Sequence, residues 1–140
     1  KITQPTIQES NQWYEVDELR TYIKNKKNEC WITYAINRKN RNVITFIAGK
    51  RTKENVGTII SKLKSLNAKR IITDKLQVYR SLIDKGTHVT RQYFTNRIER
   101  KNLTLRTHLK RLNRRTICFS KSRYMLDNCL KIYFWSIANT

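Results

Sequence analysis

Three of the ten acidic residues occupy positions where their carboxylates could act together: Asp17, Asp74 and Glu99. Asp17 lies in a predicted strand, Asp74 at the end of another strand, and Glu99 at the start of a predicted helix. Clustered carboxylates repel one another unless a cation lies between them, and their hard oxygen atoms suit Mg²⁺ or Mn²⁺. Two such ions about 4 Å apart can activate a water or a 3′-hydroxyl at a phosphodiester. The spacing is compatible with phosphoryl transfer, but taken alone it fits ordinary surface salt bridges of the three acids better.

The charge of the chain limits what it can bind. Thirty Lys and Arg residues against ten Asp and Glu residues give a formal net charge of +20. Each phosphate that a cation neutralises releases condensed counterions, so a polyanion is the expected partner. Nucleic acid is favoured, an anionic membrane surface is the second candidate, and a heavily solvated basic face is the alternative to both.

Many of the cations follow Glu99 closely. At about 100° per residue, Arg106 and Lys110 fall on nearly the same side of the predicted helix as Glu99, whereas other arginines fan round the opposite side. We expect the first group to contact phosphates near the reacting bond and the second to bind flanking DNA; alternatively, half of them only solvate the helix. Asn102 could orient a metal ligand, bind the DNA backbone or cap a loop. The predicted DNA-binding residues are Arg97, Arg100, Lys101, Asn102, Arg106, Lys110, Arg111, Arg114 and Arg115.

The elements that must position these residues form a mixed α/β sheet. Strands are predicted at residues 12–19, 30–36, 43–48 and 70–73, with a brief strand near 88–90. Helices are predicted from a cap at Thr52 to an exit at Asn67, over 78–83 with a stop at Gly86, over 98–112, and over about 121–135 with Ser120 as the cap. On the first strand, Glu15 and Asp17 share one face while Glu18 points to the other. The last helix is apolar over so broad a surface that it should dock on the sheet or on a partner subunit.

The length of 140 residues fits one domain. Residues 1–11 are polar and contain the only proline, so we expect a loose lead-in followed by one domain over residues 12–140. No apolar run approaches the roughly 20 residues that cross a bilayer, so no membrane is expected.

The cysteines and tryptophans are interpreted as structural. Cys30, Cys118 and Cys129 form no C-x-x-C pair, so neither a disulfide framework nor a structural zinc site is predicted, and a reducing cytoplasm fits best. The three tryptophans, at positions 13, 31 and 135, are expected in the core rather than as platforms for base stacking.

Four segments resemble the catalytic half of a bacterial transposase, most closely the insertion sequence 1 family. They are Trp13-Tyr14-Glu15-Val16-Asp17-Glu18, Ile72-Thr73-Asp74 followed by Tyr79, the run from Arg97 to Arg106, and Phe119-Ser120-Lys121-Ser122. The resemblance covers about residues 13–135. The segment Arg-Ile-Glu-Arg-x-Asn-Leu-x-Leu-Arg is its specific part, because the two aspartate motifs alone would be weak.

The resemblance implies a ribonuclease-H-like fold with the order β-β-β-α-β-α-β-α and a C-terminal helix. It also implies an Asp-Asp-Glu triad of Asp17, Asp74 and Glu99 that holds Mg²⁺ or Mn²⁺, two ions per site. The reaction would be cleavage at the 3′ ends of the element, followed by attack of those 3′-hydroxyls on target DNA. The implied partners are double-stranded DNA, as element ends and as target, and further copies of the chain, at least a dimer on DNA in the bacterial cytoplasm.

Two other functions remain open within the same resemblance. The chain could be an inactive remnant that binds DNA, or a nuclease of the same fold that cuts strands without joining them. Members of the family usually carry an upstream zinc module and a helix-turn-helix, and the residues before Gln12 contain neither pattern.

Overall fold

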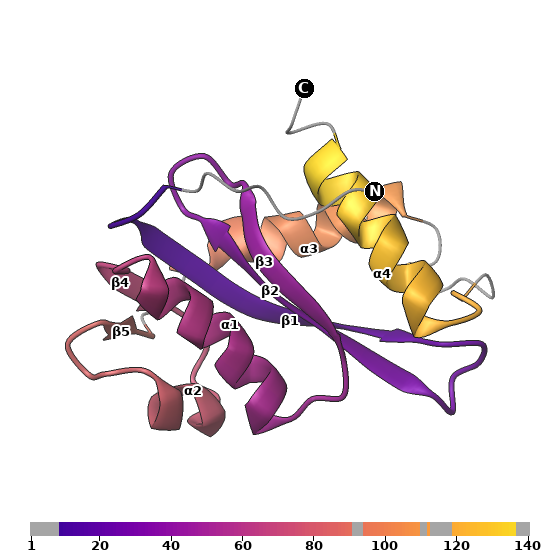
Figure 1. Ribbon diagram of the computed structural model, residues 1–140, viewed down its shortest axis with the longest axis horizontal. Coiled ribbons are helices and arrows are strands. Elements are labelled where there is room, and N and C mark those ends of the chain that lie inside the picture. The colour runs from indigo at the N-terminus through magenta and orange to yellow at the C-terminus, as the bar shows by residue number, and fades with distance from the viewer. Residues whose placement is uncertain (1–8, 91–93, 110–111, 113–118, 137–140) are drawn as a thin grey trace.

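In a computed structural model of the chain, residues 9–90, 94–109, 112 and 119–136 are described, and their strands form one mixed sheet (Figure 1). The strands are β1 (Trp13–Tyr22), β2 (Glu29–Asn37), β3 (Val43–Gly49), β4 (Arg70–Ile72) and β5 (His88–Val89). Their order is β3-β2-β1-β4-β5. The first three pair antiparallel, whereas β4 runs parallel to β1, and β5 runs parallel to β4. All five predicted strands are present, and β1 is the central strand.

The helices follow the predicted order. They are α1 (Lys53–Ser65), α2 (Gln77–Leu82), α3 (Asn96–His108) and α4 (Arg123–Lys131), and α4 continues into a π-helical segment (Ile132–Ser136). Thr52 caps α1 as expected, because its side chain accepts a hydrogen bond from the Asn55 N–H. Asn67 adopts a left-handed φ of 53° just beyond α1, which turns the chain toward β4.

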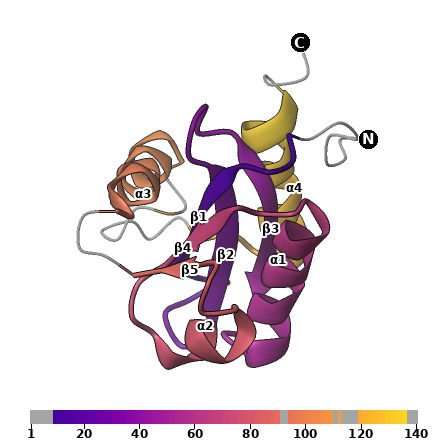
Figure 2. The same ribbon diagram turned by 90° about the vertical axis from the view of Figure 1, so that its left-hand side faces the viewer.

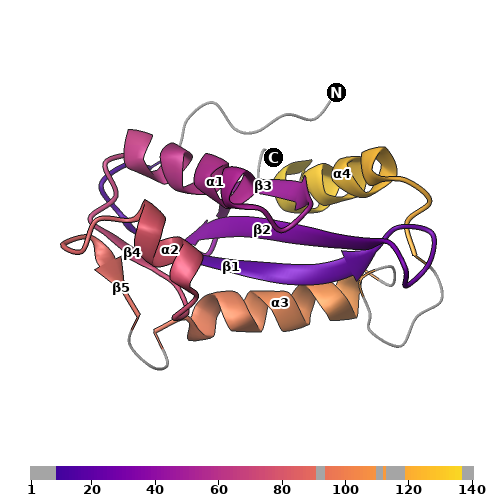
Figure 3. The same cartoon turned by 90° about the horizontal axis from the view of Figure 1, so that it is seen from below.

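Two hydrophobic clusters lie on opposite faces of the sheet. One contains side chains of α1 and α2, among them Val56, Ile60 and Tyr79. The other contains side chains of α3 and α4, among them Ile98 and Leu126. Figure 2 shows α1 and α3 on opposite sides of the strands, and Figure 3 shows α3 lying along β1. Each face of β1 is therefore covered by different helices, as befits a sheet between two helical layers.

Three predicted helix boundaries are wrong. The helix α3 ends at His108 rather than at Leu112, because Leu109 takes an extended conformation and the Arg106 side chain donates to the Leu112 carbonyl. Ser122, not Ser120, caps α4 through its hydrogen bond with the Met125 N–H. The shorter helix α2 ends at Leu82, before the predicted stop, because the next residue has extended backbone.

The apolar last helix docks on the sheet, which was one of its two predicted positions. Leu126 and Leu130 of α4 are fully buried, and Phe134 stacks on Tyr34 of β2 with ring centroids 5.9 Å apart. The tryptophan prediction is partly wrong, because Trp135 is buried but Trp13 is 39% exposed and Trp31 is half-buried. Among the described residues, Cys30 and Cys129 are free thiols, and no helix is long and apolar enough to span a membrane. Cys118 lies outside the described residues.

Candidate active site

The pairing of β1 with β4 brings two of the three predicted carboxylates to the same level. The parallel register aligns Trp13 with Arg70 and Glu15 with Ile72. Two residues beyond the Glu15–Ile72 pair, Asp17 lies within β1 and Asp74 lies just after the end of β4. Neighbouring strands lie about 4.8 Å apart, so the two aspartates start from adjacent backbone positions. The negative charge of Asp74 contributes to raising the pKa of the Asp17 carboxyl.

Asp17 is held by neutral hydrogen-bond donors. Its Oδ1 accepts the Glu18 N–H at 2.8 Å, and its Oδ2 accepts the side-chain amide of Asn102 at 3.0 Å. The Tyr34 hydroxyl in turn donates to Asn102 Oδ1 at 2.5 Å, which fixes the orientation of that amide. Burial raises the pKa of Asp17 to about 6; the two hydrogen bonds lower it, and the Asp74 charge raises it further. The predicted role of Asn102 in orienting a ligand therefore has a contact that supports it.

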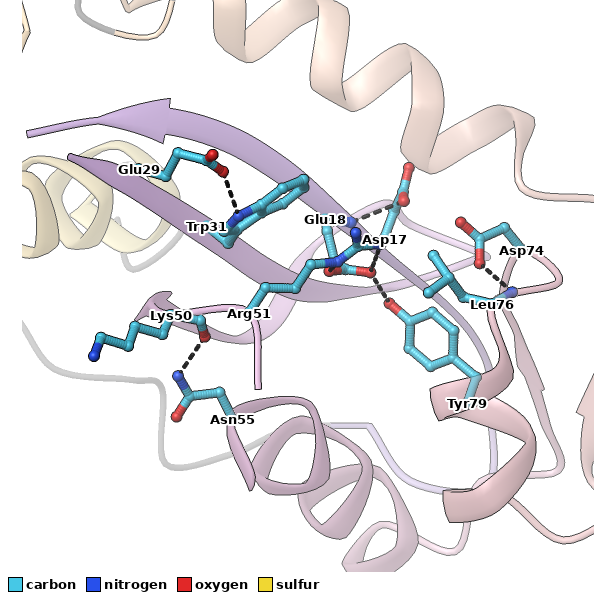
Figure 4. Close-up of polar contacts among 10 residues, drawn as sticks. All are labelled: Asp17, Glu18, Glu29, Trp31, Lys50, Arg51, Asn55, Asp74, Leu76 and Tyr79. Atoms are coloured by element: carbon cyan, nitrogen blue, oxygen red, sulfur yellow. Dashed lines mark hydrogen bonds and ion pairs between the residues drawn. The ribbon is translucent and has the colours of Figure 1, made fainter. Parts of the chain in front are cut away.

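Asp74 lies in a more open position. It is exposed, and its Oδ1 accepts the Leu76 N–H at 3.0 Å in a turn that leads into α2. Just before it, the Thr73 hydroxyl lies 2.6 Å from His88 Nε2, which joins the ends of β4 and β5. Figure 4 shows the Asp74 side chain extending from the end of β4 toward Asp17, whose carboxylate points to α3.

A buried carboxylate fastens α3 to β1. Glu15 has no exposed surface, and its Oε1 accepts the Ile98 N–H in the first turn of α3 at 3.1 Å. The open end of a helix carries unpaired N–H groups and a partial positive charge, so a carboxylate stabilises it. Arg38 balances the charge of Glu15, with Nε 3.4 Å from Oε2.

This anchor sets the register of α3 along β1. From Ile98 to Asn102 the helix advances by roughly 6 Å. From Glu15 to Asp17 the strand advances by roughly 6.6 Å. The two steps match, so the Glu15–Ile98 contact brings Asn102 beside Asp17.

The third predicted carboxylate lies apart from the other two. Glu99 is exposed on α3, and its Oε1 accepts the Thr95 hydroxyl at 3.2 Å. Among the described residues, no group of three or more His, Cys, Asp or Glu side chains is assembled closely enough to hold a metal ion. Glu99 precedes Asn102 by three residues, so the two share one part of the helix surface. The structure thus puts Asp17 and Asp74 at adjacent positions of neighbouring strands, whereas Glu99 lies on α3 with Thr95 as its hydrogen-bond partner.

Sequence reasoning did not assign a role to the opposite face of β1. Glu18 is nearly buried, and it forms an ion pair with Arg51, whose Nε lies 2.6 Å from Glu18 Oε2. The Tyr79 hydroxyl donates to Glu18 Oε1 at 3.1 Å (Figure 4). The period-two alternation of the strand correctly separated Glu18 from Glu15 and Asp17, but it carried no sign of these partners.

The predicted DNA-binding residues have different surroundings. Arg100 is exposed, Arg97 is half-buried, and burial lowers the pKa of Lys101. The guanidinium of Arg106 donates to the carbonyls of Leu112 at 3.0 Å and Arg20 at 3.4 Å, so part of its hydrogen-bonding capacity serves the protein itself. The remaining members of the set, Lys110, Arg111, Arg114 and Arg115, lie outside the described residues.

Solved structures show which fold the chain shares. The catalytic core domain of the HTLV-2 integrase, determined in complex with magnesium, superposes with a TM-score of 0.56 at 15% identity, covering 91% of this chain and 85% of that one. A simian T-cell lymphotropic virus intasome, in complex with PP2A regulatory subunit B56 gamma, gives a TM-score of 0.57 at 17% identity, covering 98% of this chain and 52% of that one. The fold is therefore ribonuclease-H-like, as predicted.

Sequence comparison identifies the family. The IS1 transposase family model matches residues 13–137. The iso-IS1n protein InsB of Shigella dysenteriae is 40% identical over 108 residues, which are 77% of this chain and 82% of the relative. The IS1 protein InsB of Shigella sonnei is 34% identical over 119 residues, which are 85% of this chain and 91% of the relative. The chain belongs to the IS1 transposase family and is a DDE transposase catalytic domain, an enzyme of phosphoryl transfer.

Proposed function

We propose that Asp17, Asp74 and Glu99 hold the divalent metal ions with which this domain cleaves DNA at the 3′ ends of an insertion sequence and joins them to a target. The observation that carries this proposal is the parallel register of β1 and β4, which puts Asp17 beside the end of β4 and Asp74, with neutral hydrogen-bond donors as the partners of Asp17. Two carboxylates that repel each other lower their energy when a cation binds between them.

The chemistry of these side chains suits Mg²⁺ or Mn²⁺. Carboxylate oxygens are the hard ligands that such ions prefer, and the integrase core with the same fold was solved with magnesium. Bound there, one or two ions would activate the attacking hydroxyl or water and stabilise the leaving oxygen. Glu99 would join the site by exchanging its hydrogen bond with Thr95 for a ligand bond, because α3 is already fixed to β1 one residue earlier.

The side chains around the carboxylates have separate tasks in this proposal. Asn102 keeps the Asp17 carboxylate in one orientation, and Tyr34 keeps Asn102 in place. Glu15 maintains the register of α3, so that Glu99 and Asn102 stay at the level of Asp17. Such supporting contacts matter because small displacements of reacting groups reduce the rate strongly.

Double-stranded DNA is the proposed substrate, and its phosphates would neutralise the excess positive charge of the chain. The net charge of +20 favours a polyanion, and the predicted cations between Arg97 and Arg115 would contact phosphates of the element end and the target. Because joining requires two ends, we propose at least a dimer on DNA, and the intasome with the same fold supports assembly of this kind. The catalytic unit would span residues 12–140.

The test is cleavage of a labelled duplex that carries the end of the element, in Mg²⁺ or Mn²⁺. Wild-type protein should release the 3′ end, and Asp74→Asn or Glu99→Gln should abolish this release while DNA affinity is kept. Asp84→Asn and Glu54→Gln are matched controls, because both residues are exposed acids outside the site. A wild-type chain that binds the duplex and never cuts it would contradict the proposal and favour the DNA-binding remnant. Cutting without joining would favour a nuclease.

A further inference from the structure

A cavity of about 420 Å³ lies next to the candidate active site, and the carboxylate chemistry makes no use of it. Its lining residues are Glu18, Arg20, Thr21, Tyr22, Lys26, Trp31, Arg106, Leu112 and Phe119. They combine three aromatic rings with three cations and a single acid. Pockets for small ligands usually have volumes of about 300–1,000 Å³, so this cavity is large enough for one nucleotide.

The cavity lies beside the part of β1 that follows Asp17, where α3 also contacts the strand. Along β1 and α3, Glu15 meets Ile98, Asp17 meets Asn102, and the Arg20 carbonyl meets Arg106. Each step along α3 is four residues, which advance by roughly 6 Å. The cavity therefore borders β1 just beyond Asp17. Arg106 lines it from α3, whereas Glu18, Arg20 and Tyr22 alternate with Asp17 and lie on the other face of the strand.

The aromatic rings of the cavity are held in fixed orientations. Tyr22 and Phe119 meet edge to face, with centroids 5.4 Å apart. The Arg20 guanidinium lies 5.8 Å from the Tyr22 centroid and 5.9 Å from that of Trp31. Both aromatic rings and guanidinium planes stack on nucleobases, and all three aromatic side chains are only half-buried.

The cations of the cavity differ in their freedom to contact a ligand. Arg20 and Lys26 are exposed, so a phosphate can reach them. Arg106 donates to two backbone carbonyls and contributes positive charge to the cavity from α3. The acid, Glu18, is already paired with Arg51 and does not repel an anion as an isolated carboxylate would.

From this chemistry we infer that the cavity binds one unpaired nucleotide of the DNA strand next to the reacting phosphodiester. The base stacks among Tyr22, Phe119 and Trp31, and Arg20 and Lys26 bind the adjoining phosphate. The nucleotide must be unpaired, because the faces of a base inside a duplex are covered by neighbouring base pairs and cannot meet protein rings. The inference rests on the proposed function, since it takes the reacting strand to run along β1 past Asp17.

The experiment measures binding without cleavage, in Ca²⁺. The probes are two duplexes of equal length, one blunt and one with a single unpaired 2-aminopurine nucleotide at its end. We expect wild-type protein to bind the overhang duplex about 10-fold more tightly, since stacking of one base contributes on that scale. The fluorescence of 2-aminopurine should fall on binding, because the base becomes stacked. Equal affinity for the two probes, or unchanged fluorescence, would overturn the inference.

Variants locate the effect in the cavity. Tyr22→Leu combined with Phe119→Leu keeps apolar volume but removes two rings, and it should abolish the preference and the fluorescence change while leaving blunt-duplex affinity as it was. Arg20→Gln, at an exposed position that does not endanger folding, should reduce the preference severalfold. Tyr124→Leu is the matched control, because Tyr124 is 77% exposed on α4 and does not line the cavity. An equal loss of preference in the control would contradict the assignment.

The same probes separate this inference from the proposed function. Asp17→Asn should lose cleavage in Mg²⁺ yet retain the preference for the overhang, because it leaves the cavity intact. If the wild-type chain prefers the overhang but never cleaves DNA, the proposed function fails and the cavity assignment stands. If it cleaves and shows no preference, the cavity assignment fails alone.

Discussion

The two faces of β1 treat neighbouring carboxylates in opposite ways. Toward α3, Asp17 accepts hydrogen bonds from a backbone N–H and from Asn102, and both donors are neutral. Toward α1 and α2, Glu18 forms an ion pair with the charged guanidinium of Arg51 and accepts a hydrogen bond from the Tyr79 hydroxyl. The two side chains are consecutive in sequence, so the difference comes from their partners. A carboxylate paired with arginine is neutralised within the fold, whereas one held by neutral donors keeps a charge that an ion can meet.

The electrostatic surroundings sharpen this contrast. Burial raises the pKa of Asp17 to about 6, and the Asp74 charge adds to that effect. On the other face, the hydrogen bond with Glu18 raises the pKa of Arg51 and so favours its charged form. Glu18 thus belongs to a satisfied ion pair, whereas the Asp17 carboxyl is under the influence of the like charge of Asp74. Unsatisfied like charge of this kind is typical of functional sites.

The largest expected effect is on catalysis. Asp17→Asn should reduce DNA cleavage in Mg²⁺ by at least about 10³-fold, because a metal ligand contributes several kcal/mol to stabilising the transition state. Glu18→Gln should stay within about 10-fold of wild-type activity, since Glu18 faces away from the carboxylate pair. Single-turnover cleavage of a labelled duplex measures both. If Glu18→Gln were as inactive as Asp17→Asn, the functional division between the two faces would be wrong.

A smaller effect is expected on stability, and here Glu18 should matter more than Asp17. Glu18→Ala should lower the free energy of unfolding by about 3 kcal/mol, because it leaves the Tyr79 hydroxyl buried without its acceptor and Arg51 without its partner. Urea denaturation measures this, and Glu54→Ala on the exposed surface of α1 is the control. An unchanged midpoint for Glu18→Ala would show that the ion pair is not structural.

Much of this architecture was predictable from local patterns. Runs of β-branched and aromatic residues predicted the strands. The cap at Thr52 and the helical spacing of Val56, Ile60 and Leu63 predicted α1. The end of α3 was not predictable, because the apolar spacing continues to Leu112 while tertiary contacts of Arg106 turn the chain away. The cap of α4 was predicted at Ser120 but lies at Ser122, because Ser120 forms a bridge with Ile23 before the helix begins.

The candidate site was predictable in part. Scarce acids at a strand and at a strand end pointed to Asp17 and Asp74, and the parallel register of β1 and β4 accounts for their meeting. The partners of these acids were not predictable, because Asn102 and Arg51 come from distant segments whose side-chain directions depend on packing. Trp31 was expected in the core, yet it lies half-exposed at a cavity, since strand alternation does not say how much of each face the helices cover.

The Asn102 side-chain amide, which donates to Asp17, allows a finer test of the difference between the two faces of β1. Asn102→Ala should lower the cleavage rate by about 10- to 100-fold, as is typical when a residue that orients a metal ligand is lost. Tyr34→Phe should have a weaker effect of the same kind, because it only frees the Asn102 amide to rotate. The rate should recover more in Mn²⁺ than in Mg²⁺ if the defect lies in ligand orientation. Equal loss in both metals, with a lowered melting temperature, would indicate a structural role instead.

The smallest effect concerns pH and isolates the unmet charge of Asp17. Its pKa near 6 in the fold exceeds the value of about 3.9 in an unfolded chain. Between these values the folded state holds a proton that the unfolded state has lost, so this contribution to stability is present below about pH 4 and is lost as the pH rises through 6. Asp17→Asn cannot titrate, so relative to wild type it should gain on the order of 1–2 kcal/mol in unfolding free energy between pH 4.5 and pH 8. Urea denaturation at the two pH values measures the gain, and Mg²⁺ at pH 8 should narrow it, because the cation stabilises the ionised wild-type carboxylates. A gain that Mg²⁺ leaves unchanged would argue that the α3 face, like the Glu18 face, is already electrostatically satisfied.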